Sequence, residues 1–380
     1  MNNIEKQRLS NRLDSSSFQS FFSNLYLNYE IPIKTLEDAD SNGIGAEYLI
    51  ITPEQFCDNL IPFVTSKENQ GLITKVANFT ETGSTVSEIE SYIQNAYDTW
   101  DIPPTYLLLV GDSNLLPTKY SPYNEAGTLP TDLYYATVDG EDIFPDLLYG
   151  RFPVRTDAEL DSIIAKNLNW VNNFNSADAW RQRVLLSAYD QAGRYFVDTS
   201  ESIRTFLEGE GYTCNTVYAP DGGPVAQDTT DLINYINAGT FFVNHRDHGI
   251  ADGWQRPEFY TSHVSSLTNV DNYPVVFSVD CETGHFDETV DSLAETMLKA
   301  SNKGAVAYIG ATRSSWSGFN DELNRGLISA IWPEYFSSYA NRYGHSSELG
   351  TVLNFGKMFM FDKYKIACLK PVLICCFFIV

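Results

Sequence analysis

Two reactive side chains follow apolar segments of the 380-residue sequence that are typical of buried strands. His248 comes shortly after residues 241–243, and Cys281 comes shortly after residues 275–279. Functional groups in open α/β sheets gather where the parallel strands end. A cysteine nucleophile needs a neighbouring base to take its proton, and an imidazole fits that role. The pair predicts covalent catalysis with Cys281 as nucleophile and His248 as acid/base.

Stabilisation of a developing oxyanion requires backbone or side-chain donors close to the nucleophile. Gly249 directly follows His248, and its lack of a side chain lets its amide approach a reacting carbonyl closely. We therefore expect the amides of Gly249 and Cys281 to form an oxyanion hole.

The same region contains further histidines, which leave two other interpretations open. His245 and His248 together with Cys281 and His285 have the residue types of a zinc site with three nitrogens and one sulfur. A fold that has lost its reaction and serves as a surface binding protein is the second alternative. Metal analysis and trapping of Cys281 with a substrate-like electrophile distinguish these from a catalytic cysteine.

The elements that must position these residues alternate between strand-like and helical patterns. Thr85 and Glu88 form a capping-box pattern at the start of one helix, and helical periodicity recurs over residues 157–174. This alternation predicts an α/β fold with doubly wound, mostly parallel sheets and helices on both faces. Strands are expected at residues 48–52, 71–76, 106–110, 184–188, 212–218, 241–243, 275–279 and 305–309. Further helices are expected around residues 202–207 and 232–236.

The chain divides into four segments on these patterns. Residues 1–47 form an N-terminal segment compatible with the remnant of a pro-region, and residues 48–177 form a first α/β half. Residues 178–364 form a second α/β half that carries His248 and Cys281, and residues 365–380 are an anomalous apolar tail.

Composition excludes several classes of function. The formal charge of -24 repels phosphate backbones, so nucleic acid is not an expected partner. The apolar run at residues 372–380 is about half the ~18 residues that a membrane-spanning helix needs. The first 17 residues lack the apolar stretch of a secretory signal. We therefore expect no membrane span and see no signal peptide in this chain.

An ordered series of motifs resembles the gingipain-like cysteine peptidases, which share a caspase-like fold. The resemblance extends from about Tyr48 to Tyr364. It rests on His248-Gly249 followed by Trp254, Cys281-x-x-Gly284-x-Phe286, Ser315-Trp316-Ser317, residues 106–112, residues 131–135, Asp139-Gly140 and residues 149–152.

The resemblance implies a cysteine endopeptidase that acts on protein or peptide substrates at the cell surface or outside the cell. It implies that Asp146 orients His248 and that Trp316 covers a specificity pocket. Relatives that cleave after arginine or lysine imply an acidic pocket residue, for which Asp157 and Glu159 are candidates; both equally fit a helix N-terminus. No catalytic cofactor is implied. Structural calcium at acidic loops such as residues 139–142 is a further expectation from the relatives.

Overall fold

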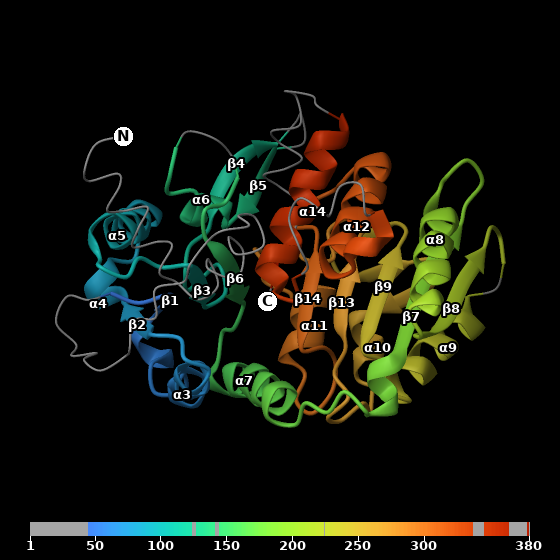
Figure 1. Ribbon diagram of the computed structural model, residues 1–380, viewed down its shortest axis with the longest axis horizontal. Coiled ribbons are helices and arrows are strands. Elements are labelled where there is room, and N and C mark those ends of the chain that lie inside the picture. The colour runs from blue at the N-terminus through green and yellow to red at the C-terminus, as the bar shows by residue number, and fades with distance from the viewer. Residues whose placement is uncertain are drawn as a thin grey trace, which may run out of the picture.

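Two mainly parallel sheets lie next to each other in the computed structural model, which describes residues 45–123, 127–140, 144–223, 225–336, 346–364 and 378–379 (Figure 1). The first sheet has the strand order β2-β1-β3-β6. All its pairings are parallel. Its strands are β1 (Tyr48–Thr52), β2 (Thr74–Asn78), β3 (Tyr106–Val110) and β6 (Leu148–Phe152).

Side chains of the first sheet alternate between two apolar layers, as a strand covered on both faces requires. Leu49 and Ile51 pack in the cluster that contains helix α5 (Val86–Thr99). Ile50, between them, packs with helices α3 (Ile61–Asn69) and α7 (Asp157–Asn172). The Thr85–Glu88 capping box begins α5, as the sequence predicts.

The second sheet carries the residues of chemical interest and has the order β15-β14-β13-β9-β7-β8. Its pairings are parallel except that of β15 with β14. Its strands are β7 (Arg183–Asp190), β8 (Thr213–Pro220), β9 (Phe242–Arg246), β13 (Val275–Ser278), β14 (Ala307–Gly310) and β15 (Phe378–Ile379).

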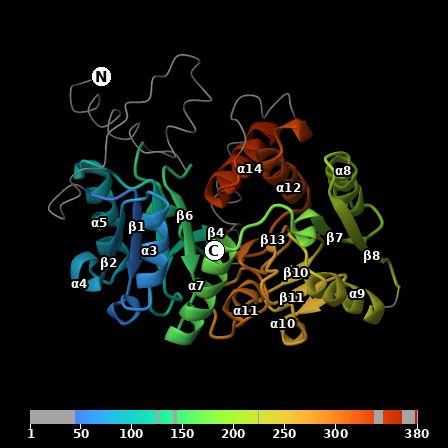
Figure 2. The same ribbon diagram turned by 60° about the horizontal axis from the view of Figure 1, so that its bottom comes forward.

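Helices cover both faces of the second sheet (Figure 2). One face carries α8 (Phe196–Gly209), α12 (Ser317–Ile331) and α14 (Leu349–Tyr364). The other carries α9 (Ala226–Asn237), α10 (Thr261–Val264) and α11 (Leu293–Lys299). The doubly wound arrangement with helices on both faces is therefore confirmed.

Shorter elements complete the described part of the chain. They are the hairpin β4 (Lys119–Tyr123) and β5 (Gly127–Thr131), the antiparallel strands β10 (Gly249–Ile250), β11 (Gly253–Gln255) and β12 (Glu258–Tyr260), the helices α4 (Phe79–Thr82) and α6 (Leu133–Ala136), and the 3-10 turns η1 (Glu54–Phe56), η2 (Ala179–Gln182) and η3 (Pro333–Phe336).

Most predicted strands are present, with shifts at their ends. The strand expected at residues 71–76 begins at Thr74, because Gly71 with a φ of 88° ends the preceding helical segment. Of the predicted N-terminal segment only residues 45–47 are described, and of the apolar tail only Phe378 and Ile379. No helix within the described residues has the length and apolar character needed to cross a membrane.

Candidate active site

The register of two neighbouring strands brings the loop that carries His248 to the loop that carries Cys281. His245 on β9 pairs with Ser278 on β13, and the Val279 amide donates to the His245 carbonyl oxygen at 2.9 Å. His248 and Cys281 each lie three residues beyond this pair, on loops that leave adjacent parallel strands at the same edge.

Gly249 confirms this close approach of the two loops. A Cβ at Gly249 would collide with the Cys281 carbonyl oxygen and would lie 2.7 Å from Asp280 Oδ2. Only a glycine fits between these atoms. The backbones of the two residues expected to form the oxyanion hole are therefore in direct contact.

The Cys281 thiol is held by the segment that follows β14. The Ser315 amide donates to Cys281 Sγ at 3.3 Å, and the thiol lies 3.5 Å from the Ser315 carbonyl oxygen. Burial raises the pKa of Cys281, and the hydrogen bonds from Ser315 oppose that rise. The side chain of Cys281 is therefore favoured as a thiol, and the Ser315 amide is a donor that a thiolate could accept from.

His248 lies between a polar and an aromatic neighbour. Its Nε2 is 2.9 Å from Gln191 Oε1, and its ring meets the Phe196 ring edge to face with centroids 5.4 Å apart. Burial lowers the pKa of His248, and the charges of Arg194 and Arg246 lower it further. A neutral imidazole is the form that can accept a proton from the thiol.

Buried polar side chains support the two loops that carry His248 and Cys281. Asp280 accepts hydrogen bonds from the hydroxyls of Ser278, at 2.9 Å, and Thr283, at 2.8 Å. Trp254 Nε1 donates to Ser278 Oγ at 2.7 Å, and the His245 ring stacks on Trp254 with centroids 4.2 Å apart. Burial raises the pKa of Asp280 to about 7. These contacts fix the backbone on either side of the nucleophile.

Glu282 and Trp316 directly follow Cys281 and Ser315, the two residues that meet at the thiol. Glu282 has a φ of 60°, in the left-handed region, and its carboxylate accepts from Ser314 Oγ at 2.6 Å. Trp316 directly follows Ser315 and is 40% exposed. An exposed indole so near the thiol is compatible with the expected cover of a specificity pocket.

The other residues expected from the resemblance lie in the first sheet and its following helix. Asp146 precedes β6, and its Oδ2 accepts from the amides of Val138 at 2.9 Å and Asp139 at 2.8 Å. Glu159 completes a capping box at the start of α7 and accepts from the Thr156 amide at 3.1 Å. Asp157 is the exposed first residue of that helix.

The four residues of the zinc alternative do not come together as a metal-binding group within the described residues. His245 Nδ1 lies 2.9 Å from Ser187 Oγ, and His285 Nε2 lies 3.2 Å from Asp287 Oδ1. Neither joins His248 and Cys281 in a group that could hold a metal within the part of the chain described. Of the acidic loop at residues 139–142, only Asp139 and Gly140 are described, so structural calcium there stays a prediction.

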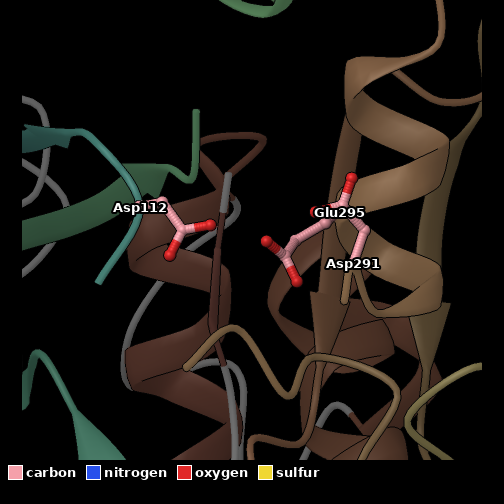
Figure 3. A group of neighbouring side chains, drawn as sticks. All are labelled: Asp112, Asp291 and Glu295. Atoms are coloured by element: carbon pink, nitrogen blue, oxygen red, sulfur yellow. The ribbon is translucent and has the colours of Figure 1, made fainter. Parts of the chain in front are cut away.

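Three carboxylates gather away from the thiol, and two basic side chains pair with them (Figure 3). Asp112, Asp291 and Glu295 point toward one another. Arg155 Nη2 lies 2.7 Å from Asp112 Oδ2, and Lys299 Nζ lies 2.8 Å from Asp291 Oδ1 and 3.0 Å from Glu295 Oε1. We call these five residues the ionic cluster. Arg155 and Lys299 pair with the three carboxylates, so the group is a network of ion pairs.

Gln191 is a site residue that sequence reasoning did not find. Gln191 follows β7, the neighbour of β9 on the side away from β13. A lone glutamine has no motif, and only the strand order reveals that it meets His248. Ser315 belongs to the Ser315-Trp316-Ser317 motif, but the sequence does not show its contact with the Cys281 thiol.

Comparison with known proteins supports the fold and the family. The family model described as peptidase family C25 matches residues 41–371. Gingipain R2 of Porphyromonas gingivalis (strain ATCC BAA-308 / W83) is 27% identical over 367 residues, which cover 92% of this chain and 47% of that protein. Lys-gingipain W83 of the same species is 27% identical over 314 residues, covering 81% of this chain and 18% of the relative. The chain thus spans about half or less of the curated relatives it matches.

A solved structure shows the same architecture. The crystal structure of the Arg specific cysteine proteinase gingipain R superposes with a TM-score of 0.78 at 24% identity, covering 90% of this chain and 77% of that one. This likeness confirms the fold. Because the family model extends over most of the sequence, the chain belongs to peptidase family C25.

Proposed function

We propose that the protein is a cysteine endopeptidase in which Cys281 attacks the peptide carbonyl and His248 transfers the proton. The observation that supports this proposal is the β9–β13 register, which brings the loop that carries His248 next to the loop that carries Cys281 at adjacent strand ends. The contact of Gly249 with the Cys281 backbone and membership of peptidase family C25 support it.

The reaction begins from a neutral pair. Because burial raises the pKa of Cys281 and lowers that of His248, the imidazole takes the thiol proton as sulfur bonds to the carbonyl carbon. The amides of Gly249 and Cys281 donate to the resulting oxyanion. His248 then protonates the departing amine, which leaves a thioester on Cys281. Water, deprotonated by His248, hydrolyses the thioester and regenerates the thiol.

Replacing the nucleophile tests the proposal. Cys281→Ala is expected to abolish peptidase activity and labelling by a peptide with a cysteine-directed electrophile, without changing the unfolding midpoint. Cys57→Ala is the matched control, because Cys57 follows η1 in the first half. Full activity of Cys281→Ala would rule out the assignment. Failure of the wild-type thiol to react with any such peptide would favour the non-catalytic surface binding protein.

We further propose a preference for arginine or lysine before the scissile bond, with Trp316 covering the pocket. The names of the relatives, Lys-gingipain and Arg specific gingipain R, support it. Asp157 is the better candidate for the pocket acid, because the Glu159 carboxylate is engaged in the capping box.

Cleavage of a peptide library measures this preference directly. We expect arginine and lysine to be enriched at the position before the cut, and Asp157→Asn to reduce that enrichment. Glu159→Gln retains capping ability and is the control. Cleavage without enrichment of basic residues would reject the specificity and leave the peptidase proposal standing.

The resemblance to gingipains also leads us to propose an extracellular or cell-surface location. Fractionation of the source cells with an antibody to this chain tests the proposal. We expect the protein in the medium or on the surface, and its confinement to the cell interior would refute this.

A further inference from the structure

Three adjacent strands of the second sheet end in three polar side chains that form one row. The order β13-β9-β7 places Cys281, His248 and Gln191 after successive neighbours. Ala188 on β7 pairs with Arg246 on β9, so the segments that follow them also run side by side. This common edge is where α/β sheets assemble their sites.

Gln191 meets the side of the imidazole that bears Nε2. The Gln191 Oε1 atom lies 2.9 Å from His248 Nε2, within normal hydrogen-bond distance. An amide oxygen only accepts, so the hydrogen of the neutral imidazole lies on Nε2. Nδ1 then keeps its lone pair and becomes the basic nitrogen of the ring.

The surroundings hold this geometry. The Arg194 amide donates to the Gln191 carbonyl oxygen at 3.1 Å, closing a turn directly after β7. Phe196, which is buried, packs edge to face on the His248 ring, and the Arg246 guanidinium lies 4.3 Å from the Phe196 centroid. Gln191 is itself partly buried. Among the described residues, Gln191 is the hydrogen-bond partner of the ring and Phe196 packs against it, and the two contacts together set its rotation.

We propose that Gln191 is a positioning residue that orients His248 through its amide oxygen and selects the tautomer with hydrogen on Nε2. This inference rests on the proposed peptidase function and deepens it. It gives the orienting role to an uncharged amide next to β9, whereas the described hydrogen bonds of Asp146 join its carboxylate to the loop before β6. A neutral partner leaves the imidazole weakly basic, in keeping with the lowered pKa of His248.

Kinetics of three variants separate orientation from general stability. Gln191→Ala is expected to lower kcat on the order of 10 to 100-fold with KM within about twofold, the size seen when a hydrogen-bonding support of a functional histidine is lost. Gln191→Glu restores an acceptor and adds a negative charge, which favours imidazolium. Its acid limb of kcat/KM should shift to higher pH by about one unit. Gln227→Ala, at an exposed glutamine that bonds Asp231 on α9, is the control.

The tautomer of His248 is measured independently of activity by 15N NMR of the protein labelled with 15N-histidine. Comparison with the spectrum of His248→Gln identifies the signals of His248. We expect a protonated Nε2 and a bare Nδ1 at neutral pH in the wild type, and a mixture of tautomers in Gln191→Ala. A hydrogen on Nδ1 in the wild type, or full activity of Gln191→Ala together with a large loss in Asp146→Asn, would overturn the inference. Activity that survives Cys281→Ala would instead refute the peptidase mechanism, while the tautomer would still report on Gln191.

Discussion

The thiol and the imidazole of the site are both biased toward their neutral forms. Burial raises the pKa of Cys281 above its ordinary 9.0 and lowers that of His248 below its ordinary 6.5. At neutral pH the protein therefore holds few thiolates, and in the proposed reaction proton transfer accompanies attack on the substrate.

The pH profile of the wild-type enzyme follows from these directions. Protonated His248 cannot act as base, so kcat/KM should rise with pH as His248 loses its proton, with a midpoint below 6.5. Alkylation of Cys281 by iodoacetamide in the absence of substrate should keep rising beyond pH 9. Measuring both curves checks the prediction. A flat alkylation curve from pH 6 to 8 with a fast rate would show a preformed thiolate, contrary to a neutral pair.

The sequence alone identifies site residues that belong to recognisable motifs. It misses residues that come close to the site only through the fold. Cys281, His248 and Gly249 are predicted from strand ends and from a His-Gly pair. Gln191 is missed because its importance depends on β7 lying next to β9, while β8 and α9 separate them in the chain. The sequence offers two roles for Glu159, as an acid of the specificity pocket and as a helix cap. Its hydrogen bonds with the backbone at the start of α7 show the capping role.

Two helices of the second half, α12 and α14, cross at a pair of glycines. A Cβ at Gly326 would lie 2.9 Å from Gly356 Cα and 2.8 Å from Phe359 Cβ. Backbone atoms cannot rotate away, so the helices approach closely only because these positions lack side chains.

Adding one methyl group tests this crossing. Gly326→Ala is expected to lower the free energy of unfolding by about 1–3 kcal/mol, the usual cost of overpacking. Gly209→Ala on α8 is the matched control, since nothing lies within 4 Å of its Cβ position. There the higher helix propensity of alanine should leave stability equal or raise it by up to about 1 kcal/mol. Denaturant unfolding of both variants gives the comparison, and equal stabilities would contradict a close crossing.

The sequence predicts helices and strands well where the pattern lies within the element itself. Apolar runs predict β1, β3 and β13 because strands buried on both faces contain little else. The β4–β5 hairpin escapes prediction because Pro122 and Pro130 are atypical of strands and its pairing depends on the fold.

Across the whole molecule, the ionic cluster joins the two halves. Asp112 and Arg155 follow β3 and β6 of the first sheet, whereas Asp291, Glu295 and Lys299 lie at or just before α11. The Asp112 and Glu295 side chains are 1% and 0% exposed. Arg155 lies between them and also donates to the Glu288 carbonyl oxygen at 2.9 Å.

Removing this guanidinium takes away the cation that lies 2.7 Å from the buried Asp112 carboxylate and leaves Lys299, at 3.8 Å, as its remaining charged partner in the cluster. Arg155→Leu is expected to cost about 3 kcal/mol of unfolding free energy, in the range observed when one partner of a buried pair is removed. Arg204→Leu on α8 removes an arginine whose ion pairs within the described residues are with partly exposed glutamates of its own helix, and it should change stability little. Chemical denaturation followed by tryptophan fluorescence measures both. Equal changes in unfolding free energy for the two variants would show that the ionic cluster does not stabilise the contact between the two halves.

The short strand β15 has a consequence for solubility. Phe378 and Ile379 pair antiparallel with Gly310 and Ile309, so they occupy the outer hydrogen-bonding edge of β14. Without them the sheet would end in an apolar strand with free amides and carbonyls, a template for pairing with another molecule. A chain cut before Phe378 should keep its inner strands and yet self-associate as its concentration rises. β15 thus acts as a cover against edge-to-edge aggregation.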